Sequence, residues 1–390
     1  MRDVKGPPGW VRAVIVAIVG LTALLLASVA CNPFSQGSAG LPAPSGNIAY
    51  IRSHLAGDDM GLFAVDVEND QVLGAPITVG RGDHGGGKSM AVSPNGKFYV
   101  LRSQLGGGKH PDRGLLILDS SRGWQRSEPP MRDDGSGVAI SSDGKAFITR
   151  STLQPDRTLR LDVRDTSDDH LITSLVIPDL IRTFLVDDEG LVYLRHWGNP
   201  ELDPPVPPGV RVIRSSDLQT VAEISLRRCY GYGLDLGPDG LLYAPVSVRW
   251  AADEAEFSSD PRLERAGSLL AIDLDKQQVV AELEVPEGPA GVTITPEGKA
   301  YILHVDPFVG SQPSKVSVYD LRERRVLTEL PVGRQGTFIK QVSPTKVYAA
   351  TRGYNQELGK IWVIDTRTDI IVNSFEVGER PEVMALPWPR

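Results

Sequence analysis

Residues 291–304 read GVTITPEGKAYILH, an alternating run, a Pro-Glu-Gly turn and a second alternating run that contains an aromatic residue. Alternation of apolar and polar residues is typical of β-strands, and such Gly-containing turns join strands into hairpins. The chain repeats this stretch with changes, as GVAISSDGKAFITR (137–150), MAVSPNGKFYVLR (90–102), GLDLGPDGLLYAPV (233–246), FLVDDEGLVYLRH (184–196) and KQVSPTKVYAATR (340–352). Each copy therefore predicts a β-hairpin.

The copies recur at intervals of 46 to 58 residues. Indexed by the aromatic residue of the second run, they are Tyr50, Tyr99, Phe147, Tyr193, Tyr243, Tyr301 and Tyr348. A third run follows in most copies and ends in a hydrophobic residue and an aspartate, at Asp66, Asp119, Asp162, Asp273, Asp320 and Asp365. A fourth alternating run comes next. Four short strands repeated seven times predict an all-β fold, a seven-bladed β-propeller with four antiparallel strands per blade.

The ends of the repeated region complete each other. Residues 46–52, GNIAYIR, form a second run without a first, and residues 380–388, RPEVMALPW, form a first run without a second. Pairing of the C-terminal strand with the N-terminal blade would close the ring and remove an exposed sheet edge. The innermost strands are then expected near residues 89–93, 137–141, 182–186, 232–236, 290–294, 338–342 and 382–386.

The repeat resembles the YVTN-type propeller repeat, whose pattern runs roughly SPDGK–YV–N, VSVID–T, V–TI–VG–P. The stretch IWVIDTRTDIIVNSFEVGERPE (361–382) matches it best, and the resemblance covers about 340 residues. Thr345 and Lys346 replace the glycine turn of the last copy, and the copy at 184–196 lacks the Ser-Pro start. The resemblance implies the propeller fold. It does not specify a function, because that family includes binding proteins, surface proteins and enzymes.

The N-terminal region has the parts of a secretory signal. Three basic residues precede an uncharged run over 13–30, which ends in small residues before Cys31. Residues 28–31 resemble a bacterial lipobox, with Ser28 where leucine is usual, which implies lipidation of Cys31. An uncleaved membrane anchor is the alternative, because 18 apolar residues nearly span a bilayer. Both interpretations place the rest of the chain outside the cytoplasm, anchored to a bacterial cell membrane.

The domain organisation follows from these segments. Residues 1–30 are expected to be a signal peptide or membrane anchor. Residues 31–45 are small, polar and rich in Pro and Gly, which predicts a flexible tether. Residues 46–390 are expected to form the propeller.

Composition excludes some classes of protein. With 40 Gly and 30 Pro in 390 residues, the chain is not a helical protein. Its formal net charge of -8 argues against general nucleic-acid binding, which needs a basic face. The two cysteines, Cys31 and Cys229, do not make a disulfide framework. Cys229, between Arg228 and Tyr230, is either a thiol activated by arginines or a small packed residue.

Candidate ligand-binding residues follow the indexed aromatic residues or lie between the copies. In a propeller these segments share one face, which here has the longest loops, over 195–208, 247–267 and 304–314. Arginine binds carboxylate and phosphate through a forked pair of donors, which suggests an anionic ligand. Pairing with nearby acids is the other interpretation. The candidate rim residues are Arg52, His54, Arg81, Arg102, Arg132, Arg150, Arg182, Arg195, His196, Arg228, His304, Arg334, Arg352 and Arg380.

The sequence contains no recognisable catalytic, phosphate-binding or metal-binding motif. We therefore expect no catalytic residue, metal or cofactor, and a binding protein whose partner is a protein, a glycan or a small anionic molecule. The alternative is an enzyme of the lactonase or lyase kind that uses the central pocket, as in some propeller relatives. A third hypothesis is a purely structural surface protein. A His or carboxylate pair within hydrogen-bond reach in an enclosed pocket would favour the enzyme.

Overall fold

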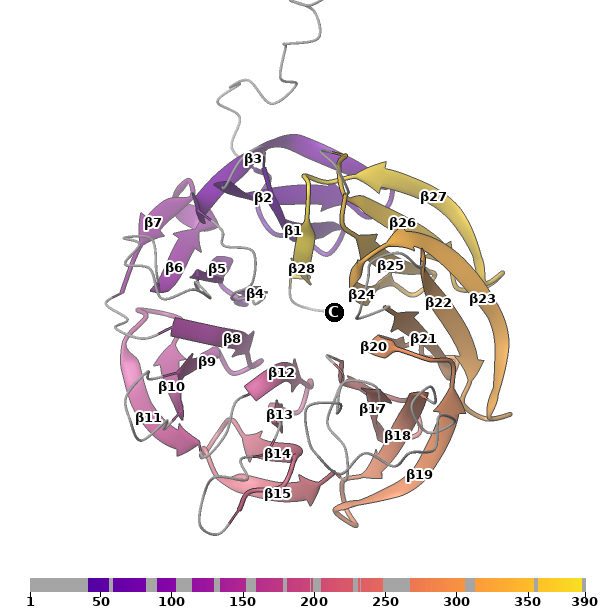
Figure 1. Ribbon diagram of the computed structural model, residues 1–390. Coiled ribbons are helices and arrows are strands. Elements are labelled where there is room, and N and C mark those ends of the chain that lie inside the picture. Colours follow the sequence, from indigo (N-terminus) through magenta and orange to yellow (C-terminus); the bar gives the residue numbers. More distant parts are fainter. Residues whose placement is uncertain are drawn as a thin grey trace, which may run out of the picture. The chain divides into compact units, whose positions relative to one another are not determined.

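The computed structural model describes residues 41–55, 59–81, 90–102, 114–129, 134–151, 159–177, 181–196, 198, 205–226, 231, 233–247, 267–305, 313–353 and 357–387. Its regular elements are β-strands, apart from one 3-10 turn, η1 (Ser120–Arg122). The strands form seven four-stranded antiparallel sheets, arranged as blades around a central axis (Figure 1). This confirms the predicted seven-bladed propeller.

From the axis outward, blade 1 contains β28 (Pro381–Ala385), β1 (Ile48–His54), β2 (Asp59–Asp66) and β3 (Gln71–Arg81). Blade 2 contains β4 (Met90–Val92), β5 (Lys97–Arg102), β6 (Gly114–Asp119) and β7 (Gln125–Ser127). Blade 3 contains β8 (Asp134–Ile140), β9 (Lys145–Ser151), β10 (Leu159–Asp165) and β11 (Leu171–Ile177). Blade 4 contains β12 (Ile181–Val186), β13 (Leu191–His196), β14 (Gly209–Arg214) and β15 (Thr220–Ser225). Blade 5 contains β16 (Asp235–Leu236), β17 (Leu242–Ser247), β18 (Gly267–Asp273) and β19 (Gln278–Val285). Blade 6 contains β20 (Pro289–Ile294), β21 (Lys299–His304), β22 (Pro313–Asp320) and β23 (Arg325–Arg334). Blade 7 contains β24 (Gly336–Ser343), β25 (Lys346–Thr351), β26 (Lys360–Asp365) and β27 (Ile370–Glu376).

The C-terminal strand closes the ring. β28 pairs with β1 antiparallel, with Ala385 opposite Tyr50 and Met384 opposite Ile51. Blade 1 thus takes its innermost strand from the end of the chain and its other three from the beginning (Figure 1). The predicted closure is confirmed, and the innermost strands lie where the repeat placed them.

This strand order creates two faces. The turns from first to second strand and from third to fourth strand form one face, here called the short-turn face. The connections from second to third strand and from each blade to the next form the opposite, long-loop face. Those predicted rim residues that the structure describes belong to the long-loop face.

The repeated aromatic residue is central to each blade. All seven are buried, and each pairs with the residue two places before the end of the third strand, as Tyr301 does with Val318. The aspartate that ends the third strand accepts backbone N–H groups of the following turn, as predicted. In blade 3, however, this aspartate is Asp165 rather than Asp162, because the register places Asp165 opposite Lys145.

Tyrosine and lysine side chains connect neighbouring blades at the short-turn face. The Tyr301 hydroxyl and the Lys299 ammonium both donate to Asp369, in the β26–β27 turn of the next blade. The same three-residue staple joins Lys97 and Tyr99 to Asp169, and Lys346 and Tyr348 to Asp70. Each aspartate has a positive φ, a conformation that Asp tolerates better than most residues. The equivalent positive-φ positions of the seven blades are Asp70, Trp124, Asp169, Leu218, Gln277, Arg324 and Asp369.

The chain enters the propeller earlier than the expected tether boundary. Leu41 is 4% exposed and belongs to the core of blades 1 and 2. Its carbonyl accepts the Trp124 indole N–H at 2.9 Å, and the carbonyl of Pro42 accepts the Tyr50 hydroxyl at 2.6 Å. Residues 41–45 of the segment predicted as tether are therefore packed against the blades.

Candidate functional site

The predicted rim residues occupy three different positions relative to the indexed aromatic residue. Arg52 and Arg195 follow it by two residues. Arg102, Arg150, His196 and His304 follow it by three, and His54 and Arg352 by four. Because successive side chains of a strand point to opposite faces, the residues at the third position face the other side of the blade from those at the second and fourth, and the second and fourth positions differ in their distance from the end of the strand.

Arg52 and Arg195 are struts between blades. Arg195 is fully buried and donates to the carbonyls of Gly233 at 2.9 Å and Pro245 at 2.8 Å, both in blade 5. Arg52 donates in the equivalent way to the Leu101 carbonyl of blade 2, at 2.5 Å. Both guanidinium groups therefore serve the packing of adjacent blades.

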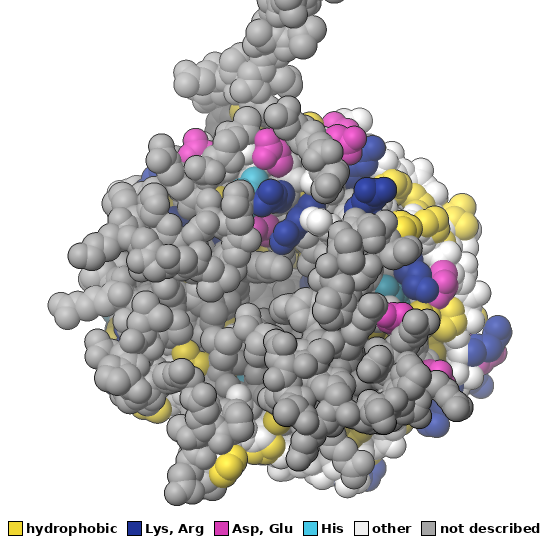
Figure 2. Space-filling view, in the orientation of Figure 1, with side chains coloured by type: hydrophobic (Ala, Val, Ile, Leu, Met, Phe, Trp, Pro, Cys, Tyr) yellow, Lys and Arg dark blue, Asp and Glu magenta, His cyan; other side chains and the backbone are white. Residues whose placement is uncertain are grey.

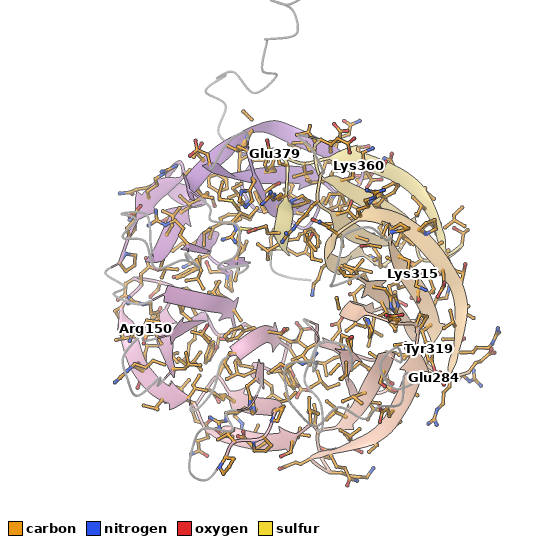
Figure 3. The ribbon with its side chains drawn as sticks, in the orientation of Figure 1. Arg150, Glu284, Lys315, Tyr319, Lys360 and Glu379 are labelled. Atoms are coloured by element: carbon orange, nitrogen blue, oxygen red, sulfur yellow. The ribbon has the colours of Figure 1, made fainter. Side chains whose placement is uncertain are left out.

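Arg102 and Arg150 form ion pairs inside their own blades. Arg150 Nε lies 2.8 Å from an Asp162 carboxylate oxygen, and Arg102 Nη2 lies 3.0 Å from Glu128. Figure 3 shows Arg150 on a different part of the ring from Glu379. These two arginines are therefore neutralised locally and do not converge with the others.

Two of the three candidate histidines also serve the fold. His196 is 4% exposed, with its Nε2 3.5 Å from Glu223. His304 is 3% exposed, and its Nδ1 lies 2.9 Å from the Glu287 carbonyl. Burial lowers the pKa of His304 to about 4, so this ring is neutral at physiological pH and donates from Nδ1. Neither is placed as a general base.

The third histidine, His54, lies in a group of charges where β28 closes the ring. Glu382 accepts from Arg52 Nη2 at 3.0 Å and lies 3.3 Å from His54 Nε2. The three residues are 6%, 3% and 1% exposed, respectively. The register of β28 against β1 skips Glu382, since Val383 pairs with Arg52 and Pro381 with Ser53. Glu382 is thus the extra residue of a β-bulge, which turns its side chain toward Arg52 and His54.

The charge of Glu382 is fixed by its partners. Burial, the largest single influence, raises its pKa, but the hydrogen bond from His54 and the charge of Arg52 together outweigh burial and lower the pKa to about 2. Glu382 is therefore ionised throughout the physiological range.

Arg352 and Arg380 are joined to this group through the backbone. The Arg380 carbonyl accepts from His54 N at 3.4 Å, and Glu379 N donates to the His54 carbonyl at 2.7 Å. The Glu379 carbonyl in turn accepts from the N–H of Gly353, next to Arg352, at 2.9 Å. We call Arg52, His54, Arg352, Arg380 and Glu382 the closure cluster. Figure 2 shows Lys and Arg side chains gathered with a His and acidic side chains over the region of β1 and β28.

Arg352 differs from the other described arginines of the cluster. Its side chain is half-buried, and burial lowers the pKa of its guanidinium, as does the charge of Arg380, against the opposite influence of Glu382. Among the described residues its guanidinium has no hydrogen-bond or ion-pair partner. A partly desolvated cation without a paired anion is unfavourable, so an added anion at this position would be stabilised.

The remaining predicted residues lie elsewhere. Arg334 ends β23 and is exposed. Arg81 and Arg182 are placed by their backbones only, in β3 and β12. Cys31, Arg132, Arg228 and Cys229 lie outside the described residues, as does much of the three long loops.

The described ranges contain neither a group of metal ligands nor a membrane-spanning helix. No three or more His, Cys, Asp or Glu residues gather there as ligands for a metal ion. In the same ranges, no helix has the length and apolar character needed to cross a bilayer.

Glu382 was not predicted as a site residue. The bulge position of the first strand holds Ala290 in blade 6, Thr337 in blade 7 and Arg182 in blade 4, so an acid occurs there only in blade 1 among these blades. The acidic residue at this position in the last run, Glu382, could have indicated a site residue. Recognising it would have required knowing that the strand has a bulge there.

Comparisons with known proteins support the fold and only hint at a role. No family model matches the chain. Antigen Lp49 of Leptospira interrogans serogroup Icterohaemorrhagiae serovar copenhageni (strain Fiocruz L1-130) is 29% identical over 143 residues, which is 33% of this chain and 29% of that protein. Among solved structures, Kuenenia stuttgartiensis hydrazine synthase is similar with a TM-score of 0.50 and 15% identity, over 72% of this chain and 76% of that chain. This likeness shows the propeller architecture alone.

Proposed function

We propose that this protein is an extracytoplasmic, membrane-anchored propeller that binds an anionic ligand at the long-loop face without catalysing a reaction. The closure cluster is the proposed binding site. The observation that carries the proposal is the half-buried Arg352, whose guanidinium feels the charge of Arg380 and has no hydrogen-bond or ion-pair partner among the described residues. Glu382 does not fill that role, because Arg52 and His54 already bind both of its oxygens.

The local match to a Leptospira antigen supports a role at the cell surface. The basic, apolar and small-residue parts of residues 1–31 support export and anchoring, by a lipid on Cys31 or by the apolar segment itself. A protein, a glycan or a small molecule could each bind to the closure cluster, provided that it presents a carboxylate, sulfate or phosphate.

The enzyme alternative has one observation in its favour. His54 and Glu382 form a His–carboxylate pair within hydrogen-bond reach, the arrangement that general base catalysis uses. Both side chains are almost completely buried, however, and Glu382 is also held by Arg52. A substrate would not reach the His54 ring, so the pair fits a structural role better than a lactonase or lyase site.

Thermal unfolding of the full chain with acetate, citrate, sulfate or phosphate tests the binding site. A ligand at 100 times its dissociation constant stabilises by about 2.7 kcal/mol. We expect at least one anion to raise the melting temperature of the wild-type protein, and the rise to be lost in Arg352→Met. Arg334→Met is the matched control, because Arg334 is exposed at the end of β23. Equal responses of both variants would refute the assignment of Arg352.

Anchoring is tested separately. Metabolic labelling of the full chain with a fatty acid should mark the wild-type protein and not Cys31→Ala. A Cys31→Ala chain that remains in the membrane fraction would support the uncleaved anchor. A wild-type chain found in the soluble fraction would refute both forms of anchoring.

A further inference from the structure

The outermost strand of blade 3 differs in composition from the other outer strands. β11 reads LITSLVI, with neither a charged residue nor a proline. It ends its sheet, with β10 on its inner side and no described strand on its outer side (Figure 1). A strand in this position presents unpaired N–H and C=O groups along its edge, to which another strand can add.

The other outer strands are protected by charge, which opposes pairing with another sheet. Each of the other six contains at least one charged residue, namely Arg81 in β3, Arg126 in β7, Glu223 in β15, Glu282 in β19, Arg325 in β23 and Glu376 in β27. β11 instead has three exposed large apolar side chains, Leu171 at 45%, Ile172 at 40% and Val176 at 60%, more than any other described strand. Contiguous exposed apolar residues of this kind mark interaction surfaces.

The middle of the outer strand also sets blade 3 apart. Ser174 of β11 pairs with Asp162 of β10. The residue of the fourth strand at the equivalent register position is a glutamate in blades 4 to 6 and a serine in blade 7, namely Glu223, Glu282, Glu329 and Ser374. Two copies of a strand that paired about such a glutamate would bring like charges together, which is unfavourable. At Ser174 no charge opposes that pairing.

We propose that β11 is a dimerisation edge, which pairs antiparallel with β11 of a second copy of this chain about a twofold axis at Ser174. The pairing joins two four-stranded blades into one eight-stranded sheet. The inference is independent of the anchoring and the anion binding proposed above, because it uses neither the N-terminal region nor the closure cluster.

The sequence of β11 is self-complementary about Ser174. A twofold axis places Ile172 opposite Val176 of the second copy, Leu171 opposite Ile177, and Thr173 opposite Leu175. The exposed apolar residues therefore face other apolar residues, which is the favourable arrangement across paired strands. In blade 7, the same arrangement about Ser374 would place Val372 opposite Glu376. The pattern thus favours self-pairing of β11 over self-pairing of β27.

The described charges beside β11 do not oppose the pairing. Asp162 is neutralised by Arg150, whose Nε lies 2.8 Å from a carboxylate oxygen, and it also accepts from the Ser174 hydroxyl at 2.8 Å. Arg160 is exposed on β10, opposite Val176. In the dimer, the β10 strands of the two copies are three strand spacings apart, about 14 Å. This exceeds the screening length of about 8 Å at physiological salt, so the two copies of Arg160 repel each other little.

The paired edge is short. The register of β11 against β10 skips Ile172, which forms a β-bulge and leaves residues 173–177 as regular strand. Interfaces as small as this bind weakly. The dimer is therefore expected to dissociate on dilution, and one charge introduced at the edge should abolish it.

The molecular mass of the full chain in detergent, measured by sedimentation over a range of protein concentrations, tests the dimer. We expect the wild type to change from monomer to dimer as concentration rises, and Val176→Lys to stay monomeric with an unchanged melting temperature, because Val176 is 60% exposed. Val372→Lys is the matched control and should dimerise like the wild type, since Val372 is 50% exposed on β27. A wild type that is monomeric at every concentration, or a dimer that Val176→Lys leaves intact, would overturn the proposal.

Disulfide cross-linking tests the register. Directly opposite residues of antiparallel strands have Cα atoms about 4.5–5.5 Å apart, a separation that a disulfide spans. Ser174→Cys in a Cys229→Ser background should therefore cross-link to its own copy under mild oxidation, and the Cys229→Ser parent gives the background from Cys31.

Ser374→Cys is the control for random collision, because Ser374 has the equivalent position on β27 and is more exposed than Ser174. We expect it to cross-link much less than Ser174→Cys. Equal cross-linking of the two variants would overturn the paired register. Cross-linking of Ser174→Cys to a different protein in place of its own copy would overturn the identity of the partner.

Discussion

Replacing Glu382 with glutamine tests the buried charges at the closure most directly. The amide keeps the shape of the side chain and removes its charge. Arg52, 3% exposed, then loses its ion pair with Glu382 and stays between β1 and blade 2, held to the Leu101 carbonyl. The variant should therefore fold with a buried cation that has lost its ion pair with Glu382.

The magnitude follows from the pKa of Glu382, lowered from 4.5 to about 2. At 1.36 kcal/mol per unit, this amounts to about 3 kcal/mol of stabilisation at neutral pH. Removal of one partner of a buried ion pair costs about 3–5 kcal/mol in other proteins, which agrees. For a ring of this size, unfolding entropy near 2.1 cal/mol/K per residue converts 3 kcal/mol into a fall in melting temperature of about 4 °C.

Thermal unfolding of the wild type and Glu382→Gln at several pH values provides the measurement. Because the folded pKa is depressed, the stabilisation is fully present above pH 4.5 and is lost as pH falls toward 2. The two proteins should therefore differ at pH 7 and converge near pH 2. Glu329→Gln is the control, since Glu329 pairs with Lys315 at the surface and should cost less than 1 kcal/mol. A difference below 1 °C at pH 7, or one unchanged at pH 2, would refute the reasoning.

Three further outcomes are expected. Asp369→Asn keeps a residue that accepts positive φ but weakens the bonds from Lys299 and Tyr301, so urea unfolding should show a loss of about 1–3 kcal/mol; an unchanged midpoint would contradict the staple. Gly137→Ala should cost about 1–3 kcal/mol, because its Cβ would collide with the Phe184 ring, whereas Gly46→Ala has open space and should be neutral. The pKa values of Tyr193, Tyr301 and Tyr348 are raised, mainly by burial and secondly by their hydrogen bonds to Asp187, Asp369 and Asp70, respectively. The stability that these tyrosines contribute is therefore retained below the ordinary tyrosine pKa of 10 and declines above it. Ultraviolet titration should show these phenols ionising only as the protein unfolds, and early ionisation of all tyrosines would count against their burial.

The repeat made the fold predictable. Each copy marks the same four strands. The first copy lacks its first run and the chain ends with an extra first run, which together indicate that β28 joins β1. The strand register also follows from the repeat, because every indexed aromatic residue pairs with the equivalent position of the third strand, two residues before its end. Blade 3 misled the alignment because the hydrophobic-Asp pair ends at Asp162, whereas the strand ends three residues later at Asp165, which follows Arg164.

The candidate site was less predictable because its position depends on register rather than on sequence proximity. Arg52 and Arg352 both follow an indexed tyrosine, yet a difference of two residues separates an interblade strut from a half-buried cation near the face. Counting residues from the tyrosine would have separated them. The bulge that directs Glu382 toward Arg52 and His54 depends on backbone pairing, and so does the docking of Leu41 on Trp124.

The origin of β28 at the end of the chain affects biosynthesis. While the polypeptide emerges from the ribosome or a translocation channel, β1 has β2 on one side and an unpaired backbone edge on the other. Arg52 also lacks Glu382 until the last residues have emerged. The protein therefore completes its first blade last. Premature termination before Pro381 would expose the backbone edge of β1 and remove the carboxylate that pairs with Arg52, and quality-control proteases could recognise both changes.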